Sequence, residues 1–273
     1  MGRSTSDSFG TAIEIDLGVA RVPVAGLTDR SHWPDVLWLL RHGESAGNVA
    51  RDAAERDGLD VIDIAERDMD VPLSERGEQQ ARAVGEWLGE QDRPPTVVVV
   101  SPYERARRTA RIALDAGHID AQVVVDDRVR EREFGVLDRL TRSGITRRFP
   151  DQAELRARVG KFYHRPPSGE SWCDVGLRLR SALATIRGDW AGERVMIVAH
   201  QVPLLMVRYV LEGLDENEIL AVDRADPLAN CSIGRYESGG DCAMARVLWN
   251  HEAPLEQAGA PVTHEPETPV APR

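Results

Sequence analysis

A run of apolar residues from Val36 to Leu40 ends abruptly in Arg41-His42-Gly43, and this junction limits what the chain can fold into. Such an unbroken apolar run is typical of a strand that is buried on both faces of a sheet. In open α/β sheets, ligands bind at the carboxyl ends of the strands. We therefore expect Arg41 and His42 to lie where a functional site would form.

Three further apolar runs alternate with stretches that suit helices. Strands are expected near residues 97–100, 122–125 and 194–199, and helices near 74–91, 102–115, 170–189 and 202–212. This alternation predicts a mostly parallel sheet in one α/β domain, for which 273 residues supply an ample core. Residues 230–237 and 242–249, joined through Gly239 and Gly240, predict a closing hairpin.

The residues at the end of the first predicted strand suit phosphate chemistry. Arg41 carries a planar, permanently charged guanidinium that matches phosphate, and His42 is a nucleophile when its imidazole is neutral. Gly43 allows a sharp turn that brings backbone N–H groups close to an anion. Phosphoryl transfer to His42 is the first hypothesis, and a surface Arg-His pair is the alternative that this tripeptide leaves open.

Other predicted strands end near residues of matching chemistry. Arg105 lies one turn into the helix after the second strand, and His200 directly follows the fourth. Glu131 and Glu133 lie on the loop after the third. Either carboxyl group could protonate a leaving oxygen and later deprotonate a water molecule. The residue types alone do not separate these two acids.

Four motifs, in this order along the chain, resemble those of the histidine phosphatase superfamily, which has the phosphoglycerate mutase-like fold. They are Arg41-His42-Gly43-Glu44-Ser45 with Asn48, the segment from Ser101 to Ala106, Glu131 with Gly135, and Ala199-His200. An ordered set of motifs is far more specific than any one of them. The resemblance covers roughly residues 36 to 250. It implies a three-layer α/β/α sandwich with a mostly parallel central sheet, and it favours Glu131 over Glu133 by the spacing to Gly135.

The resemblance also implies a mechanism. His42 would form a phosphohistidine while Glu131 protonates the departing oxygen, and water activated by the same carboxylate would then cleave the intermediate. Arg41, Arg105 and His200 would bind the equatorial oxygens, so neither a metal nor another cofactor is expected. Five more residues are predicted to bind the substrate: Ser45, Asn48, Gln201, Lys161 and Arg142. Ser45 has the alternative role of capping the following helix.

Within the superfamily, the stretch from Gly135 to Ser171 resembles the phosphatase domain of fructose-2,6-bisphosphatases. The sugar-phosphate pocket departs from that pattern, because Arg142 and Trp172 stand where tyrosines are usual and Leu205 stands where an arginine is usual. The substrate therefore cannot be carried over. The expected function is the metal-independent hydrolysis of a small phosphorylated metabolite.

Two other activities compete with this hypothesis. Gly43-Glu44-Ser45-Ala46-Gly47 satisfies the G-x-S-x-G nucleophile elbow of serine α/β-hydrolases, but those enzymes carry the elbow later in the chain, after an oxyanion loop. Phosphoryl transfer of the phosphoglycerate mutase type needs a closed pocket that excludes water. Gly47 stands where those mutases generally carry tryptophan, which favours hydrolysis.

The two ends of the chain differ from its middle. Residues 1–35 are expected to form a flexible N-terminal extension, residues 36–251 the catalytic domain, and residues 252–273, rich in Pro, Ala and Glu, a flexible tail. The stretch 49–71 is long and acidic, which indicates an insertion near the mouth of the site. It forms either a lid or a mere surface excursion.

Composition narrows the range of partners. A net charge of −11 argues against nonspecific nucleic-acid binding, and no stretch is long and apolar enough to suggest a membrane span. Three cysteines without a C-x-x-C pair, and first residues without the pattern of a secretory signal, lead us to expect a cytoplasmic protein. A basic site in an acidic chain suits a small phosphorylated metabolite as partner. The sequence leaves homo-oligomerisation open.

Overall fold

A six-stranded sheet forms the centre of the computed structural model, which describes residues 32–239 and 243–264. The strand order is β3-β2-β4-β1-β5-β6. The first four strands run parallel, β5 pairs antiparallel with β1, and β6 pairs antiparallel with β5. This confirms the mostly parallel sheet and its closing hairpin. The strands are β1 (Val36–Arg41), β2 (Val97–Val100), β3 (Gln122–Val125), β4 (Arg194–Ala199), β5 (Ile233–Ser238) and β6 (Met244–His251).

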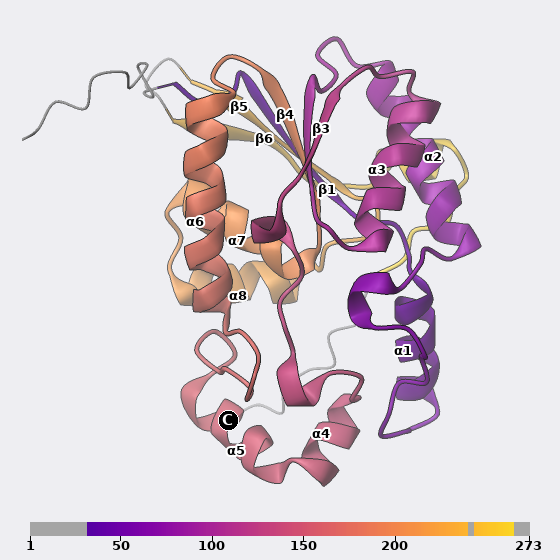
Figure 1. Ribbon diagram of the computed structural model, residues 1–273, viewed down its shortest axis with the longest axis vertical. Helices are drawn as coiled ribbons and strands as arrows, with labels where there is room; N and C mark the ends of the chain where they lie inside the picture. The colour runs from indigo at the N-terminus through magenta and orange to yellow at the C-terminus, as the bar shows by residue number, and fades with distance from the viewer. Residues whose placement is uncertain (1–31, 240–242, 265–273) are drawn as a thin grey trace, which may run out of the picture.

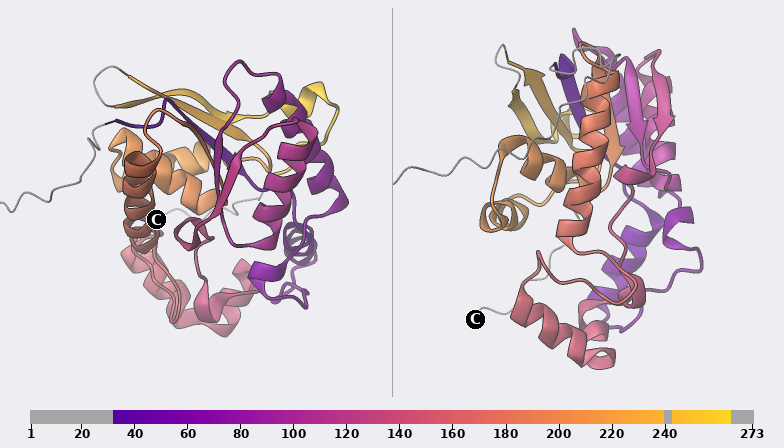
Figure 2. Two further views of the ribbon diagram at one scale, coloured as in Figure 1. Left: turned by 45° about the horizontal axis from the view of Figure 1, so that its top comes forward. Right: turned by 60° about the vertical axis from the view of Figure 1, so that its left-hand side comes forward.

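Helices cover both faces of the sheet and complete the predicted α/β/α sandwich (Figures 1 and 2). Alternate residues of β1 face opposite layers: Leu37 and Leu39 pack with α6 and α7, while Trp38 and Leu40 pack with α2 and α3. Within the described residues no helix is both long and apolar enough to cross a bilayer. The helices are α1 (Ala46–Arg56), α2 (Glu75–Gly89), α3 (Glu104–Ala116), α4 (Arg142–Arg148), α5 (Pro150–Val159), α6 (Trp172–Asp189), α7 (Gln201–Glu212), α8 (Glu216–Ala225) and α9 (Ala253–Gln257), with short 3₁₀ turns η1 (Asp68–Asp70), η2 (Asp127–Val129) and η3 (Gly135–Leu137).

The register between the two central strands explains why the predicted site residues meet. β1 and β4 are parallel neighbours, and Arg41 pairs with Ala199 at their carboxyl ends. The next backbone amide, that of His42, donates to the carbonyl of Ala199 at 3.0 Å. His42 and His200, each the first residue after its strand, are therefore brought to the same edge of the sheet.

The acidic stretch 49–71 is part of the folded structure and not a mere surface excursion. It contains most of α1, and Figure 1 shows α1, α4 and α5 gathered at one end of the molecule, beyond the sheet. The backbone amide of Ile62 donates to Arg139 at 2.8 Å, and that of Thr141 donates to Asp60 at 3.0 Å. These bonds join the insertion to the segment that leads into α4, a helix that the sequence did not predict.

The ends of the catalytic domain lie further out than the sequence predicted. Residues 252–264 were expected to be flexible, yet Leu255 on α9 is fully buried and packs against the core layer formed with α2 and α3. Thr263 donates to the side chain of Asn230 at 3.1 Å. Trp33, in the predicted N-terminal extension, packs against the other core layer. Both predictions are wrong for these segments, because the buried Leu255 and the partly buried Trp33 pack against the core; residues 1–31 and 265–273 lie outside the described residues.

Candidate active site

Eight of the ten residues predicted for the site line a single cavity of about 290 Å³. They are His42, Ser45, Asn48, Arg105, Glu131, Arg142, Lys161 and Gln201. The other two, Arg41 and His200, are fully buried at the ends of β1 and β4. The ends of the parallel strands therefore bring the predicted residues into one region, as expected for an open α/β sheet.

His42 is held with one ring nitrogen available for chemistry. Its Nδ1 lies 2.7 Å from the carbonyl oxygen of Gly43, and since a carbonyl only accepts, Nδ1 carries the proton and Nε2 the lone pair. Burial lowers the pKa of His42 well below its usual value, and the charges of Arg105 and Arg41 lower it further. The imidazole is therefore neutral, which is the nucleophilic form.

The turn after His42 requires glycine. A Cβ atom on Gly43 would lie 2.5 Å from the carbonyl oxygen of Gly77 in α2, which no side chain can satisfy without moving the backbone. The amide of Gly43 donates to the hydroxyl of Thr109 on α3 at 3.0 Å. The loop that carries His42 is thus clamped between two helices of the same layer, which fixes the direction of the imidazole.

Two arginines supply the positive charge around His42. Arg41 is completely buried and donates to the carbonyl of Leu228; burial is the main reason that its pKa falls to about 10. Arg105, in the first turn of α3, is 5% exposed and lies over the ring of Tyr103, 4.9 Å from its centroid. Arg105 lines the cavity, whereas Arg41 lies behind it.

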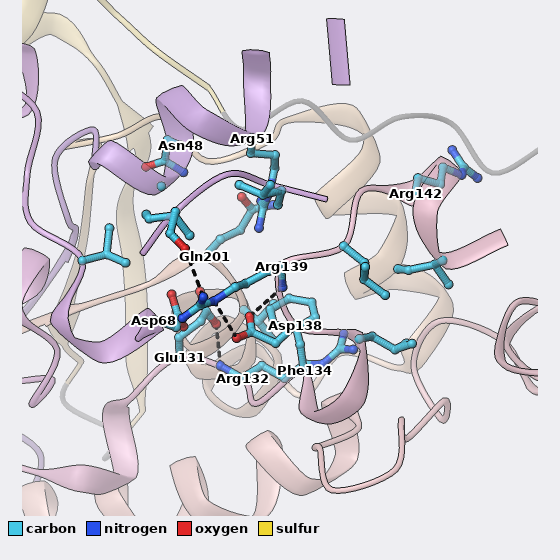
Figure 3. A pocket seen from close by; sticks show the side chains of 18 of the residues that line it. Asn48, Arg51, Asp68, Glu131, Arg132, Phe134, Asp138, Arg139, Arg142 and Gln201 are labelled. Atoms are coloured by element: carbon cyan, nitrogen blue, oxygen red, sulfur yellow. Dashed lines mark hydrogen bonds and ion pairs between the residues drawn. The ribbon is translucent and has the colours of Figure 1, made fainter. Parts of the chain in front are cut away.

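Asp68, on η1 of the insertion, forms an ion pair with Arg105. Its carboxylate lies 3.0 Å from the guanidinium, and its carbonyl oxygen accepts a second bond from the same group. Asp68 also lines the cavity, as Figure 3 shows. The sequence indicated only that the insertion was acidic, because nothing in its pattern singles out Asp68 among eight acidic residues of that stretch. The insertion therefore places a carboxylate inside the candidate anion site.

The structure separates the two candidate acids. Glu131 lines the cavity, and burial raises the pKa of its carboxyl group. Glu133 is exposed, does not line the cavity and accepts a hydrogen bond from the Tyr103 hydroxyl at 3.1 Å. A carboxyl group with a raised pKa keeps its proton at higher pH, so Glu131 is the one suited to act as an acid.

The loop that carries Glu131 is fixed by Arg178 of α6. This guanidinium donates to the carbonyls of Arg128, Arg130 and Glu131 at 2.7, 2.9 and 3.1 Å. A bidentate ion pair with Glu170 holds Arg178 in place, with both distances 2.9 Å. One largely buried side chain thus binds three backbone carbonyls of the loop that carries the carboxyl group. The sequence reasoning did not single out Arg178, because its role depends on packing between distant elements.

His200 has a defined partner on one side of its ring. Its Nε2 lies 2.8 Å from the hydroxyl of Ser101, and the backbone amide of Tyr103 donates to that same hydroxyl at 3.3 Å. Ser101 can therefore donate its own proton to Nε2, which leaves the other proton on Nδ1. Among the described residues Nδ1 of His200 has no hydrogen-bond partner, and the two imidazole centroids of His42 and His200 are 5.0 Å apart.

Ser45 and Asn48 form the N-terminal cap of α1. The Ser45 hydroxyl accepts from the backbone amide of Asn48 at 3.1 Å, and Oδ1 of Asn48 accepts from the backbone amide of Ser45 at 3.0 Å. This capping box satisfies donors that the first turn of a helix leaves unpaired. The Ser45 hydroxyl also donates to Oδ1 of Asn48 at 2.9 Å and not to an imidazole. The geometry of a serine-hydrolase elbow, with its histidine base, is not formed here.

Of the other predicted substrate-binding residues, Gln201 and Lys161 share the partner Asp223, whereas Arg142 lies apart from them. Gln201 donates from Nε2 to Asp223 at 3.0 Å, which directs its Oε1 elsewhere; that oxygen is buried and has no partner among the described residues. Lys161 forms an ion pair with the same buried Asp223 and lies 5.1 Å from the ring centroid of Trp172. Arg142 lies at the outer edge of the cavity, apart from Gln201 in Figure 3.

Several lining residues were missed by the sequence reasoning. They are Arg51, Arg132, Phe134, Asp138, Arg139, Gln152, Arg156 and His164. Four of these eight are arginines, a residue type common on solvated surfaces, and only the fold shows that all eight surround one cavity. Within the described chain, no cluster of three or more His, Cys, Asp or Glu residues is arranged to hold a metal ion.

Comparison with known proteins identifies the family. A family model of the histidine phosphatase superfamily (branch 1) matches residues 37–251. The chain belongs to the histidine phosphatase superfamily. Among curated relatives, the probable phosphoglycerate mutase GpmB of Photorhabdus laumondii subsp. laumondii is 30% identical over 203 residues, 74% of this chain and 84% of that protein. The protein of the same name from Erwinia tasmaniensis is 33% identical over 202 residues, with the same coverage.

Solved structures of the superfamily share the fold. A mycobacterial glucosyl-3-phosphoglycerate phosphatase in complex with VO3 superposes with a TM-score of 0.62 and 27% identity, over 80% of this chain and 100% of that one. YhfR from Bacillus stearothermophilus gives a TM-score of 0.64 at 25% identity, over 79% of this chain and 96% of that one. This superfamily assignment confirms the resemblance that the four motifs indicated.

Proposed function

We propose that this protein is a metal-independent phosphomonoesterase that hydrolyses a small phosphorylated metabolite through a phosphohistidine on His42. The observation that carries the proposal is the neutral imidazole of His42, with Nε2 unprotonated, beside two guanidinium groups and a carboxyl group of raised pKa. A nucleophile, an anion-binding group and a proton donor are the three parts that phosphoryl transfer requires.

In the first step, Nε2 of His42 attacks phosphorus and the ester P–O bond breaks. The proton of Glu131 moves to the departing oxygen, so an alcohol leaves and a carboxylate remains. The Nδ1–H of His42 donates to the Gly43 carbonyl throughout, which stabilises the positive charge that the ring gains when Nε2 is phosphorylated. Arg105 and the proton on Nδ1 of His200 bind the phosphoryl oxygens.

In the second step, water attacks the phosphohistidine. The Glu131 carboxylate takes a proton from the water, the N–P bond breaks, and its electron pair returns to Nε2 of His42. Inorganic phosphate leaves and Glu131 is again protonated, so the cycle closes without a metal. Arg41, buried behind His42, contributes its charge to the site at short range through a medium of low polarity.

Relatives of two kinds bear on the reaction. The glucosyl-3-phosphoglycerate phosphatase supports hydrolysis, while the probable phosphoglycerate mutases at 30–33% identity favour phosphoryl transfer as the second candidate. The resemblance to fructose-2,6-bisphosphatases supports a sugar phosphate. Two positions argue against fructose 2,6-bisphosphate as the substrate. Leu205, where those enzymes usually have an arginine, is fully buried in the core and does not line the cavity. Trp172, where they usually have a tyrosine, packs its ring against the ammonium group of Lys161.

A trapping experiment tests the proposed function. The protein is mixed with a ³²P-labelled ester and quenched, and we expect an adduct that is labile in acid and stable in base, mapped to His42. Release of labelled phosphate identifies hydrolysis, whereas return of the label to another position of the same substrate identifies transfer. A label on a hydroxyl group, Ser45 included, would overturn the proposal.

Asp68→Asn is expected to strengthen the binding of phosphate. The Asp68 carboxylate competes with a phosphoryl group for Arg105, and an ion pair of this exposure contributes up to about 1 kcal/mol. We therefore expect the inhibition constants of phosphate and vanadate to fall by about 2- to 10-fold. Asp70→Asn on the same turn, where the carboxylate pairs with the exposed Arg67, is the matched control and should change neither constant. Weaker vanadate binding in Asp68→Asn would show that Asp68 instead positions Arg105.

A further inference from the structure

Ser101, the first residue after β2, lies beside His200, the first residue after β4. The two strands are parallel neighbours, and Val100 pairs with Val198 near their carboxyl ends. The backbone amide of Ser101 donates to the carbonyl of Val198 at 3.0 Å, which continues the pairing by one residue. The same register brings the Ser101 hydroxyl to the His200 ring, and its oxygen lies 2.8 Å from Nε2.

The hydroxyl proton of Ser101 has a single acceptor within the part of the chain that the structure describes. The oxygen already accepts from the backbone amide of Tyr103 at 3.3 Å, and that amide offers no lone pair in return. The remaining polar atom within hydrogen-bond distance is Nε2 of His200. Ser101 is fully buried, so a proton on Nε2 would leave the hydroxyl proton buried without an acceptor, at a cost in free energy.

The His200 ring carries one proton. Burial lowers the pKa of His200 well below its usual value, and the neighbouring positive charges, that of Arg105 foremost, lower it further. A neutral imidazole is protonated on one nitrogen only. Because Nε2 accepts from Ser101, that proton is on Nδ1.

The Nδ1–H group has no hydrogen-bond partner among the described residues, although His200 is fully buried. Most buried donors in proteins are paired, so an unpaired one calls for a ligand or another explanation. The ring centroids of His200 and His42 are 5.0 Å apart. A phosphoryl group on His42 would lie beside this ring and would supply the acceptor that Nδ1–H lacks.

Packing alone cannot choose the tautomer of His200. The ring of Tyr103 packs edge-on against that of His200, with centroids 5.0 Å apart and an interplanar angle of 69°. The Tyr103 hydroxyl donates to Glu133 at 3.1 Å, which fixes the aromatic ring from outside the cavity. These contacts hold the imidazole in place, but the two tautomers have the same shape. Only a hydrogen bond to a ring nitrogen distinguishes them.

We propose that Ser101 is a positioning residue that fixes the tautomer of His200, so that Nδ1–H is the group presented to a phosphoryl oxygen at His42. This inference rests on the proposed function. Ser101 does not line the cavity, so it acts through His200 and not on the substrate. The opposite tautomer would present a lone pair to the phosphoryl oxygen, and one donor of the anion site would be lost.

Nuclear magnetic resonance reads the tautomer directly. Two-bond ¹H–¹⁵N correlation spectra of protein labelled with ¹⁵N-histidine separate protonated from unprotonated ring nitrogens, and the signals missing in His200→Ala assign the ring. In wild type we expect Nδ1–H to predominate at neutral pH. In Ser101→Ala we expect the ratio of Nδ1–H to Nε2–H to fall by about 3- to 10-fold, because the bond that favours Nδ1–H is gone. A wild-type ring protonated on Nε2, or an unchanged ratio in Ser101→Ala, would overturn the proposal.

Ser232→Ala is the matched control. Ser232 is also buried, and within the described chain its hydroxyl has no partner. Removing that hydroxyl should leave the tautomer ratio of His200 at the wild-type value, and Ser101→Thr, which keeps a hydroxyl at the same position, should retain most of it. A shift in Ser232→Ala as large as that in Ser101→Ala would mean that the loss of any buried hydroxyl has this effect, and the proposal would fail.

Vanadate binding tests the consequence without turnover. We expect the Kd for vanadate to rise by about 2- to 10-fold in Ser101→Ala, because a smaller fraction of the protein carries the donor. In a His200→Ala background the same substitution should leave the Kd unchanged, since the two residues act as one unit. An equal rise in both backgrounds would show that Ser101 acts by another route and would overturn the proposal.

The two measurements also separate this inference from the proposed function. If the tautomer ratio and the Kd change as expected, yet no ester releases phosphate and no adduct forms on His42, the positioning role stands and the hydrolytic function fails. If phosphate is released through the adduct while Ser101→Ala keeps the wild-type tautomer ratio, the function stands and the role of Ser101 fails.

Discussion

Replacing His42 with alanine is expected to lower phosphate release by at least about 10⁴-fold with every ester tested, because the covalent intermediate of the proposed reaction forms on its Nε2. Among the lining residues His42 and His164 carry imidazoles: Nε2 of His42 is left unprotonated by the bond from Nδ1 to the Gly43 carbonyl, whereas Nε2 of His164 faces Oε1 of Gln152 at 3.4 Å. The effect should therefore not depend on the leaving group. The measurement is kcat/KM for an aryl ester and an alkyl ester, with quantification of the acid-labile adduct.

His118→Asn is the control for this substitution. His118 lies outside the cavity, after α3, and its backbone φ of 50° is one that asparagine tolerates. This variant should form the adduct at the wild-type level. If His42→Ala keeps about one tenth or more of the wild-type turnover, a covalent role for His42 is contradicted and direct attack by water is favoured.

Glu131→Gln is expected to separate substrates by their leaving groups. An alkyl ester needs a proton on its departing oxygen, so its hydrolysis should slow by about 10²- to 10⁴-fold. A nitrophenyl ester leaves as a stable anion and should slow much less in the first step. Glu133→Gln is the matched control, since Glu133 is exposed and bonded to Tyr103 outside the cavity. Equal slowing of both esters in Glu131→Gln would contradict its role as the acid.

The pH profile gives an independent check of the same residue. The acid must be protonated for the first step, and burial raises the pKa of Glu131, so activity toward alkyl esters should extend above the usual range of a glutamate. As pH rises through that raised pKa, the acid form is lost and kcat/KM falls. In Glu131→Gln this alkaline limb should disappear, because glutamine does not titrate. An alkaline limb that persists unchanged would assign it to another group.

The elements that carry the chemistry were predictable because local pattern determines them. The apolar run before Arg41 and the valine run before Ser101 can be buried only in a sheet covered on both faces, and parallel strands place their ends together. Parallel strands of this kind bring His42 and His200 to one edge whichever of them are neighbours, since all four parallel strands end at the same side.

The outer part of the cavity was not predictable in the same way. Asp68 and Arg132 lie on loops, and Arg156 lies on a helix with a weak apolar face, so no periodic signal places them. Their positions depend on contacts between segments far apart in the chain, such as the bonds that join Ile62 to Arg139. The choice between Glu131 and Glu133 likewise needed the fold, because residues two apart on a loop have equivalent patterns.

Residues 261–263 reach back to the catalytic loop. Gln80 accepts from the amide of Glu44 at 2.9 Å and donates to Pro261 and Thr263. The backbone of Thr263 accepts from Asn230, whose side chain donates to the carbonyl of His42 at 3.1 Å. The loop that carries the nucleophile is thus supported by a segment that follows every residue of the candidate site along the chain. A nascent chain lacking it has every catalytic side chain but not the scaffold that aligns them, which couples competence for catalysis to completion of this region.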